Sequence, residues 1–230
     1  MKKQKRQAQI ELKEPSKFRL FVRARLFSIF DFFYTLFHYW TKIRFFFVDF
    51  TMLSAYFFQS PYRIARKFHQ GLSPYGETPF KTMKRIADKV GIKPEDTVYE
   101  LGSGRGRCCF FLAMFYGCVV VGFENVPKFV EIASIIKKIF RVQNVSFVLH
   151  DIFDDFDLSG ATVIYLYGTC LSDEEIVFLA DRFAKLKKGT KIITISYSLC
   201  DYVKDTRIKL AQSFDVAFQW GTTTCYEHVL

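Results

Sequence analysis

Residues 98–107 read Val-Tyr-Glu-Leu-Gly-Ser-Gly-Arg-Gly-Arg, and this stretch decides the fold. The apolar residues up to Leu101 are typical of a buried strand, and the glycines that follow predict a tight turn that opens a helix. Glycine permits positive φ and lets a ligand lie against bare backbone. Gly102, Gly104 and Gly106 are spaced two apart, so the third comes one residue too early for the dinucleotide fingerprint. The pattern therefore favours a nucleotide-like ligand other than NAD or FAD.

Acidic residues accompany the glycine turn at two strand ends. Glu100 lies two residues before the first glycine, and Glu124 ends the next predicted strand, residues 118–123. An acid at that strand end can accept hydrogen bonds from both hydroxyls of a ribose. The turn and its acids resemble the first motif of class I S-adenosylmethionine (SAM) methyltransferases. The resemblance implies that SAM is the cofactor and that it is bound by Glu100, Gly102, Ser103, Gly104, Gly106 and Glu124.

Strand and helix patterns alternate from residue 71 onward, which indicates a parallel sheet covered on both faces. A helix is expected to start at Pro79, with Thr78 as its N-cap, and to stop at Gly91. A short turn with Gly221 predicts a final antiparallel hairpin. We therefore predict an α/β, Rossmann-like seven-stranded sheet, mostly parallel with a C-terminal antiparallel hairpin, as in class I methyltransferases. Its strands are expected over residues 97–101, 118–123, 145–149, 162–167, 191–196, 214–219 and 223–229.

Two further strand ends stand where class I methyltransferases carry functional residues. His150-Asp151-Ile152 follows residues 145–149, and the resemblance implies that Asp151 contacts the adenine amino group and Ile152 the ring. A carboxylate at a strand end is also a routine helix cap, so both interpretations stay open. The next strand ends in Tyr165-Leu166-Tyr167-Gly168-Thr169, without the Asn-Pro-Pro-Tyr signature of amino-directed enzymes. Tyr167 and Thr169 are candidates for the methyl-acceptor pocket, with packing of the tyrosines as the alternative.

Residues 74–78 read Pro-Tyr-Gly-Glu-Thr and precede the first helix of the predicted domain. They resemble the loop that folds over SAM in histone-lysine methyltransferases without a SET domain, the disruptor-of-telomeric-silencing type. The resemblance implies that Tyr75, Glu77 and Thr78 contact the cofactor, and an ordinary turn is the alternative. The family's Asn-Asn-Phe sequence is missing after the fourth strand. In that region the chain is similar to small protein-lysine methyltransferases that act on other proteins.

Charge is distributed unevenly along the 230 residues. Residues 1–44 hold eleven basic and three acidic side chains, whereas residues 71–230 hold nineteen of each. The basic part favours an anionic partner, a membrane or a nucleic acid, with a solvated tail as the alternative. A neutral catalytic part lacks the basic stripe of nucleic-acid enzymes, so nucleic acid is the less favoured substrate. We predict a basic extension over residues 1–70 and a methyltransferase domain over residues 71–230.

The extension is rich in aromatic residues, with thirteen phenylalanines, three tyrosines and one tryptophan in residues 18–60. Between Arg25 and Lys42, polar residues recur every three or four positions, which predicts a helix with a narrow polar stripe and a wide apolar arc. The longest stretch without charge, residues 50–62, is shorter than the ~20 residues that span a bilayer. The arc is expected to pack on protein or, through residues 1–60, to contact a membrane peripherally.

The six cysteines form no Cys-x-x-Cys pair and have no histidine at metal spacing, so we expect no metal site and a reducing compartment. Acids interrupt the basic start where a signal peptide would be apolar, so a cytoplasmic location is expected, at a membrane if the extension binds lipid. These features predict a SAM-dependent methyltransferase, foremost a protein-lysine N-methyltransferase with a protein substrate. The alternatives are methylation of a small molecule or lipid, and a SAM-binding or membrane-docking adaptor without turnover.

Overall fold

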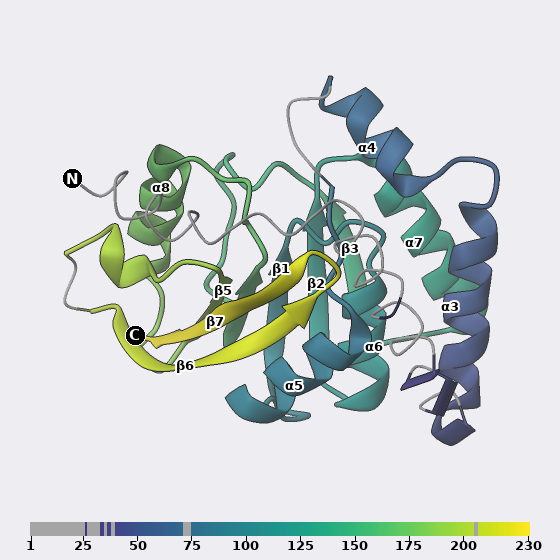
Figure 1. The fold of residues 1–230 in the computed structure, drawn as a ribbon, viewed down its shortest axis with the longest axis horizontal. Helices are drawn as coiled ribbons and strands as arrows, with labels where there is room; N and C mark the ends of the chain where they lie inside the picture. Colours follow the sequence, from purple (N-terminus) through teal and green to yellow (C-terminus); the bar gives the residue numbers. More distant parts are fainter. Residues whose placement is uncertain (1–25, 27–32, 35, 38–39, 71–74, 205–206) are drawn as a thin grey trace.

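The computed structural model describes residues 26, 33, 34, 36, 37, 40–70, 75–204 and 207–230, with a seven-stranded sheet at its centre (Figure 1). The strand order is β3-β2-β1-β4-β5-β7-β6. The first five strands run parallel, and β7 runs antiparallel to both β5 and β6. The strands are β1 (Thr97–Leu101), β2 (Val119–Glu124), β3 (Val145–Leu149), β4 (Val163–Leu166), β5 (Lys191–Ile195), β6 (Lys209–Phe218) and β7 (Gly221–Val229). This architecture confirms the predicted Rossmann-like sheet with its C-terminal hairpin.

Helices cover both faces of the sheet (Figure 1). Because side chains alternate along a strand, Val98 and Val163 join a core with α5 (Phe80–Val90), α6 (Arg107–Phe115) and α7 (Pro127–Phe140). Leu101 and Ile164 join a second core on the other face, with α8 (Asp173–Phe183) and the short 3₁₀-helix η1 (Leu199–Asp201). Strands buried on both faces explain the apolar runs in the sequence.

Two helices before this domain lie wholly within the described residues, α3 (Ile43–Ala55) and α4 (Pro61–Phe68). α3 packs against α6 and α7, as an outer layer on their side of the sheet (Figure 1). Its buried residues are Phe45, Val48, Asp49 and Met52, and the Phe45 ring meets the Phe80 ring edge-on at 5.2 Å. The inner face of α3 thus shares the first core of the sheet domain. The division of the chain at residue 70 stays a prediction.

Two expectations about element ends were wrong. Thr78 does not cap α5, because the helix begins at Phe80 after Pro79 and the Thr78 hydroxyl bonds the Tyr165 hydroxyl at 2.6 Å. β6 begins at Lys209, five residues before the expected Phe214, because its first half is an exposed, largely polar edge that lacks the pattern of a buried strand. The helix expected over residues 25–42 lies largely outside the described residues. Within the described part of the chain, every helix is too short or too polar to cross a membrane.

Candidate functional site

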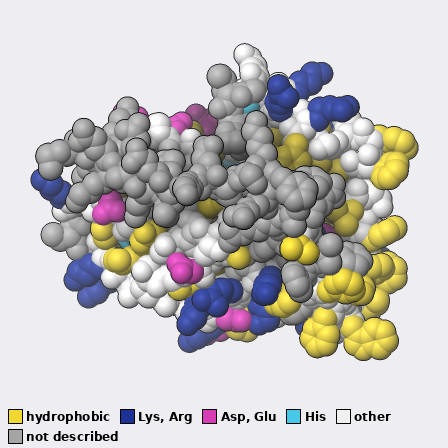
Figure 2. Space-filling view, viewed as in Figure 1, with side chains coloured by type: hydrophobic (Ala, Val, Ile, Leu, Met, Phe, Trp, Pro, Cys, Tyr) yellow, Lys and Arg dark blue, Asp and Glu magenta, His cyan; other side chains and the backbone are white. Residues whose placement is uncertain are grey.

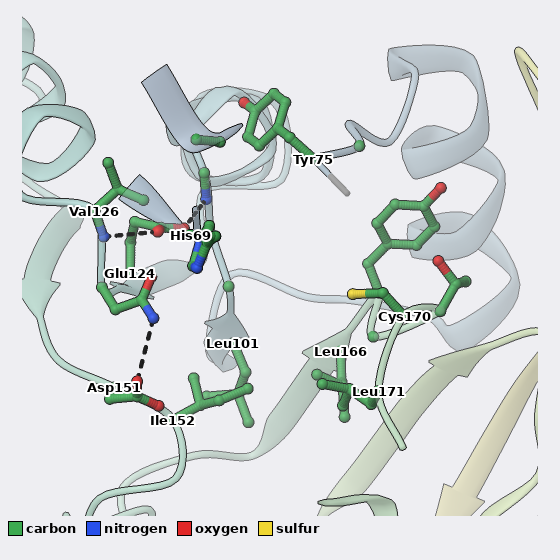
Figure 3. Close-up of a pocket in the computed structure, with 18 of the residues that line it drawn as sticks. His69, Tyr75, Leu101, Glu124, Val126, Asp151, Ile152, Leu166, Cys170 and Leu171 are labelled. Carbon is green, nitrogen blue, oxygen red and sulfur yellow. Dashed lines mark hydrogen bonds between the residues drawn. The ribbon is translucent and has the colours of Figure 1, made fainter. Parts of the chain in front are cut away.

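A cavity of about 360 Å³ opens at the carboxyl ends of β1, β2 and β4 (Figure 3). The strand order reverses between β1 and β4, and ligands of open α/β sheets bind at this kind of switch point. The volume lies in the range of ~300–1,000 Å³ that is usual for small-ligand sites. Predicted site residues that line it are Tyr75, Gly102, Gly104, Glu124, Asp151, Ile152, Tyr167 and Thr169.

The glycine loop forms one wall of this cavity, and its geometry explains two of the glycines. Gly104 has φ +54°, and a Cβ there would lie 3.0 Å from the Tyr75 hydroxyl. Gly106 has φ +78° and caps α6, and a Cβ there would lie 2.3 Å from the Phe147 ring. A side chain at either position would therefore strain the backbone and push an aromatic ring away. The loop keeps its backbone thin where it meets the cavity.

Glu124 ends β2 beside the glycine loop and is buried (Figure 3). Its Oε2 accepts a hydrogen bond from the Gly104 amide at 2.7 Å, and its Oε1 accepts one from the Val126 amide at 2.9 Å. Burial raises the pKa of Glu124, although these two hydrogen bonds and the nearby His69 oppose the rise. Each oxygen keeps a second lone pair, so the carboxylate can accept hydrogen bonds from a ligand as well.

Asp151 and Ile152 follow β3 and line another part of the cavity (Figure 3). The Asp151 Oδ1 accepts the amide of Phe153 at 3.0 Å, and its Oδ2 accepts the side-chain amide of Asn125 at 3.2 Å. The carboxylate therefore stabilises the turn after β3 and also lines the cavity. It does not cap a helix, because the next regular element after β3 is the strand β4.

Four predicted cofactor residues lie away from the large cavity and line a space of about 20 Å³ beneath the glycine loop: Glu77, Thr78, Glu100 and Ser103. Glu100 is buried and its Oε2 accepts the thiol of Cys109 at 2.9 Å. Burial raises the pKa of Glu100 to about 8. The Glu100 carboxylate thus bonds the first turn of α6.

Glu77 is held by arginines of the glycine loop. Its carboxylate receives two hydrogen bonds from Arg105, Nε to Oε1 at 2.5 Å and Nη2 to Oε2 at 2.6 Å. Arg107 lies 3.5 Å from the same carboxylate and forms a bidentate pair with Asp49 of α3, at 2.7 and 2.9 Å. Burial opposes ionisation of Glu77, but Arg105 outweighs it and lowers the pKa. Loop 75–78, the glycine loop and α3 thus share one ion-pair network.

Aromatic side chains line the part of the cavity near the hairpin. Tyr167 stacks on Phe218 with ring centroids 5.0 Å apart, and its hydroxyl accepts a hydrogen bond from the Trp220 indole at 3.0 Å. Gly76 lies against the Tyr167 ring, and a Cβ at Gly76 would lie 2.8 Å from that ring. Burial raises the pKa of Tyr167, which keeps the phenol neutral. Tyr167 and Thr169 both line the cavity.

Several lining residues escaped the sequence interpretation. Trp220 comes from the hairpin turn, and His69 follows α4, in the segment assigned to the extension. Neither belongs to a recognisable motif, so tertiary structure alone brings them to the cavity. Ala65 of α4 and Phe129 of α7 likewise line the cavity without a motif. The remaining lining residues belong to the quoted motifs or adjoin them: Gly76, Leu101, Asn125, Val126, His150, Phe153, Leu166, Gly168, Cys170 and Leu171. Among the described residues, no group of three or more His, Cys, Asp or Glu side chains could hold a metal ion.

A Rossmann-like sheet with a glycine loop, a strand-end acid and a cavity at the switch point defines the class of SAM-dependent methyltransferases. Within it, the chain belongs to the family described as "Histone methylation protein DOT1", whose model matches residues 66–216. A protein-lysine N-methyltransferase of Saccharolobus islandicus is 27% identical over 128 residues, which are 55% of this chain and 78% of the relative.

Solved structures agree with this class. An RNA methyltransferase of Salinibacter ruber in complex with S-adenosylhomocysteine is 26% identical with a TM-score of 0.55, covering 66% of this chain and 92% of the other. Magnesium protoporphyrin IX methyltransferase of Synechocystis with bound SAM shares the fold, at 15% identity, a TM-score of 0.56, and coverage of 78% and 95%. The protein is a SAM-dependent methyltransferase, and the thin glycine loop beside a buried carboxylate fits that cofactor.

Proposed function

We propose that this enzyme is a protein-lysine N-methyltransferase. The observation that carries the proposal is the aromatic wall of the cavity, where Tyr167 and Trp220 are joined by a hydrogen bond and both line the space. Trp220 is 50% exposed, so it lies at the entrance to the cavity. Aromatic faces attract ammonium groups and pack on a lysine's aliphatic stem. The name of the Saccharolobus relative and the loop 75–78 give independent support.

The cofactor would lie between the glycine loop and the residues after β3. We assign the ribose hydroxyls to Glu124 and the adenine to Asp151 and Ile152, because these side chains line the cavity on separate strand ends. Glu77 would act indirectly, because it binds Arg105 of the glycine loop, whereas Thr78, Glu100 and Ser103 line the small space beside that loop. When bound, SAM supplies an activated methyl group on a positively charged sulfur.

Residues of the acceptor side would prepare the lysine nitrogen. An ammonium has no free lone pair, so it must lose its proton before it can attack the methyl carbon. Leu166, Leu171 and Tyr167 line this side, and desolvation among apolar groups lowers the pKa of an amine. The proton leaves to solvent, and the neutral nitrogen forms a bond to carbon as the carbon–sulfur bond breaks. Tyr167 and Thr169 then serve to orient the nitrogen, and alignment supplies most of the catalysis.

Labelled SAM incubated with the enzyme and a cell lysate tests the proposal. We expect the label in a fraction that protease digests and nuclease spares, and mass spectrometry should place it on lysine. Glu124→Ala, which should lose the cofactor, is the matched control for labelling by lysate enzymes. Label that nuclease releases would assign an RNA acceptor, and label in the lipid extract would assign a lipid. Absence of label, with SAM binding intact, would favour an adaptor.

A further inference from the structure

The outward-facing side of α3 carries a row of exposed apolar side chains. Ile43, Phe47, Phe50 and Leu53 follow one another every three or four residues, so they share one side of the helix. Phe57 and Phe58 follow directly after the helix. We call these six residues the α3 aromatic face. Their side chains are between 47% and 90% exposed.

The opposite side of the same helix is committed to the protein core. Phe45, Val48 and Met52 are 1% exposed and lie on the buried side. α3 packs against α6 and α7, which fixes how the helix is rotated and leaves the α3 aromatic face pointing outward. Scattered surface apolar residues are normal, but a row of four on one side of a helix, followed by two more exposed phenylalanines, marks an interaction surface. Packing within the domain therefore explains the apolar residues on the buried side of α3 but not those on its exposed side.

Basic side chains flank this face. Lys42 and Arg44 stand at the start of α3, and Arg63, Arg66 and Lys67 are exposed on α4, next along the chain. Figure 2 shows hydrophobic side chains along the edge formed by α3 and Lys and Arg side chains beyond them, over α4. The sole acid in residues 40–70 is Asp49, which is buried and paired with Arg107. The surface is thus apolar in the middle and positive around it.

We propose that the α3 aromatic face docks on an anionic membrane surface. An amphipathic helix with aromatic residues on one side and basic residues beside them binds in the plane of the lipid headgroups. The 13 residues of α3 are too few to span a bilayer, so the helix lies along the surface. A second copy of the chain is a poorer occupant, because face-to-face contact would bring the two sets of basic side chains together. An acidic lipid surface complements both the apolar centre and the positive rim.

Vesicle flotation of the full chain tests this docking. We expect the protein to float with phosphatidylcholine vesicles that contain ~30 mole percent phosphatidylserine, to float less with pure phosphatidylcholine, and to be released as salt rises. The triple variant Phe47→Ser/Phe50→Ser/Leu53→Ser should reduce the bound fraction about tenfold or more, because it removes three apolar side chains from the lipid contact. Arg63→Gln/Arg66→Gln/Lys67→Gln should reduce the preference for phosphatidylserine.

The matched control is Val119→Ser/Leu210→Ser, which alters two side chains that are each 46% exposed but lie on β2 and β6. This variant should float like the natural protein. Binding of S-adenosylhomocysteine by each variant reports whether its domain is folded. If the triple variant unfolds, the single change Phe57→Ser, which lies outside the helix, tests the α3 aromatic face instead. Flotation that is absent, equal on both vesicles, or unchanged in the face variants would overturn the proposal. A dimer in solution that the triple variant dissociates, without vesicle binding, would assign the face to self-association instead.

Discussion

Replacing Asp49 by asparagine tests whether α3 is a structural part of the methyltransferase domain. Asp49 is 2% exposed, and both of its oxygens accept hydrogen bonds from Arg107, the first residue of α6. Asparagine has nearly the same shape, so the change removes the charge and one acceptor and creates no large cavity. The change therefore acts on the ion pair that joins α3 to the first residue of α6.

The expected cost follows from burial. Removing one partner of a buried ion pair typically costs 3–5 kcal/mol, whereas an exposed pair is worth about 0.2–1 kcal/mol. Arg107 keeps two other neighbours after the change, the Glu77 carboxylate at 3.5 Å and the Phe80 ring at 4.3 Å, so it is not left uncompensated. We therefore expect Asp49→Asn to lower the free energy of unfolding by about 2–3 kcal/mol, somewhat less than the usual cost of breaking a buried pair.

Urea denaturation of the full chain measures this cost. Lys84→Ala is the control, because the Lys84–Asp88 pair on α5 is exposed, and its loss should cost no more than ~0.5 kcal/mol. A double-mutant cycle with Arg107→Gln should return most of the cost as coupling between the two residues. If Asp49→Asn costs as little as Lys84→Ala, or if the cycle shows no coupling, the pair does not tie α3 to the domain and the reasoning fails.

Three further predictions concern the cavity and the loop behind it. Glu124→Ala should weaken S-adenosylhomocysteine binding by about 2–4 kcal/mol in calorimetry, because two charge-assisted hydrogen bonds to ribose are lost, and unchanged affinity would contradict our assignment. Burial raises the pKa of Glu100 from its ordinary 4.5 to about 8, so between these values the folded state keeps a proton that the unfolded chain has lost. The free energy of unfolding should therefore be greatest below this window and fall as pH rises through it, and urea titrations should show that Glu100→Gln flattens the fall. Trp220→Ala should lower kcat/KM for a lysine peptide about tenfold through lost cation–π contact and leave cofactor affinity unchanged, whereas an equal loss of both would place Trp220 on the cofactor side.

The sequence predicted the sheet and the glycine loop well because their signals are local. A buried parallel strand reads as a short apolar run, and β1, β3 and the parallel part of the sheet were found this way. Gly104 and Gly106 are required by backbone conformation and by close aromatic neighbours. Strand-end residues such as Glu124 and Asp151 reach one edge of the sheet because parallel strands end together there.

The direction of side chains could not be predicted in the same way. Glu77 matches a loop that covers SAM in related enzymes, and its carboxylate binds Arg105, a partner 28 residues further along the chain that the motif does not indicate. Thr78 has the position and chemistry of a helix cap, yet its hydroxyl meets Tyr165 of β4. In both cases the tertiary structure brings a polar side chain from a distant part of the chain within hydrogen-bond distance, and the local sequence pattern does not indicate that partner. The same applies to Trp220, which reaches the cavity through the hairpin turn.

The helix α3 shows why composition alone leaves two interpretations open. The wide apolar arc predicted for residues 25–42 lies largely outside the described residues, but α3 poses the same choice between packing on protein and contact with lipid. Phe45, Val48 and Met52 fill the core on one side, while Phe47 and Phe50 stay exposed on the other. Deleting the helix would therefore remove core packing and the exposed face together, so loss of vesicle binding after truncation would say nothing about docking. Point changes on the exposed side separate the two roles, because they leave the buried residues and the Asp49–Arg107 pair in place.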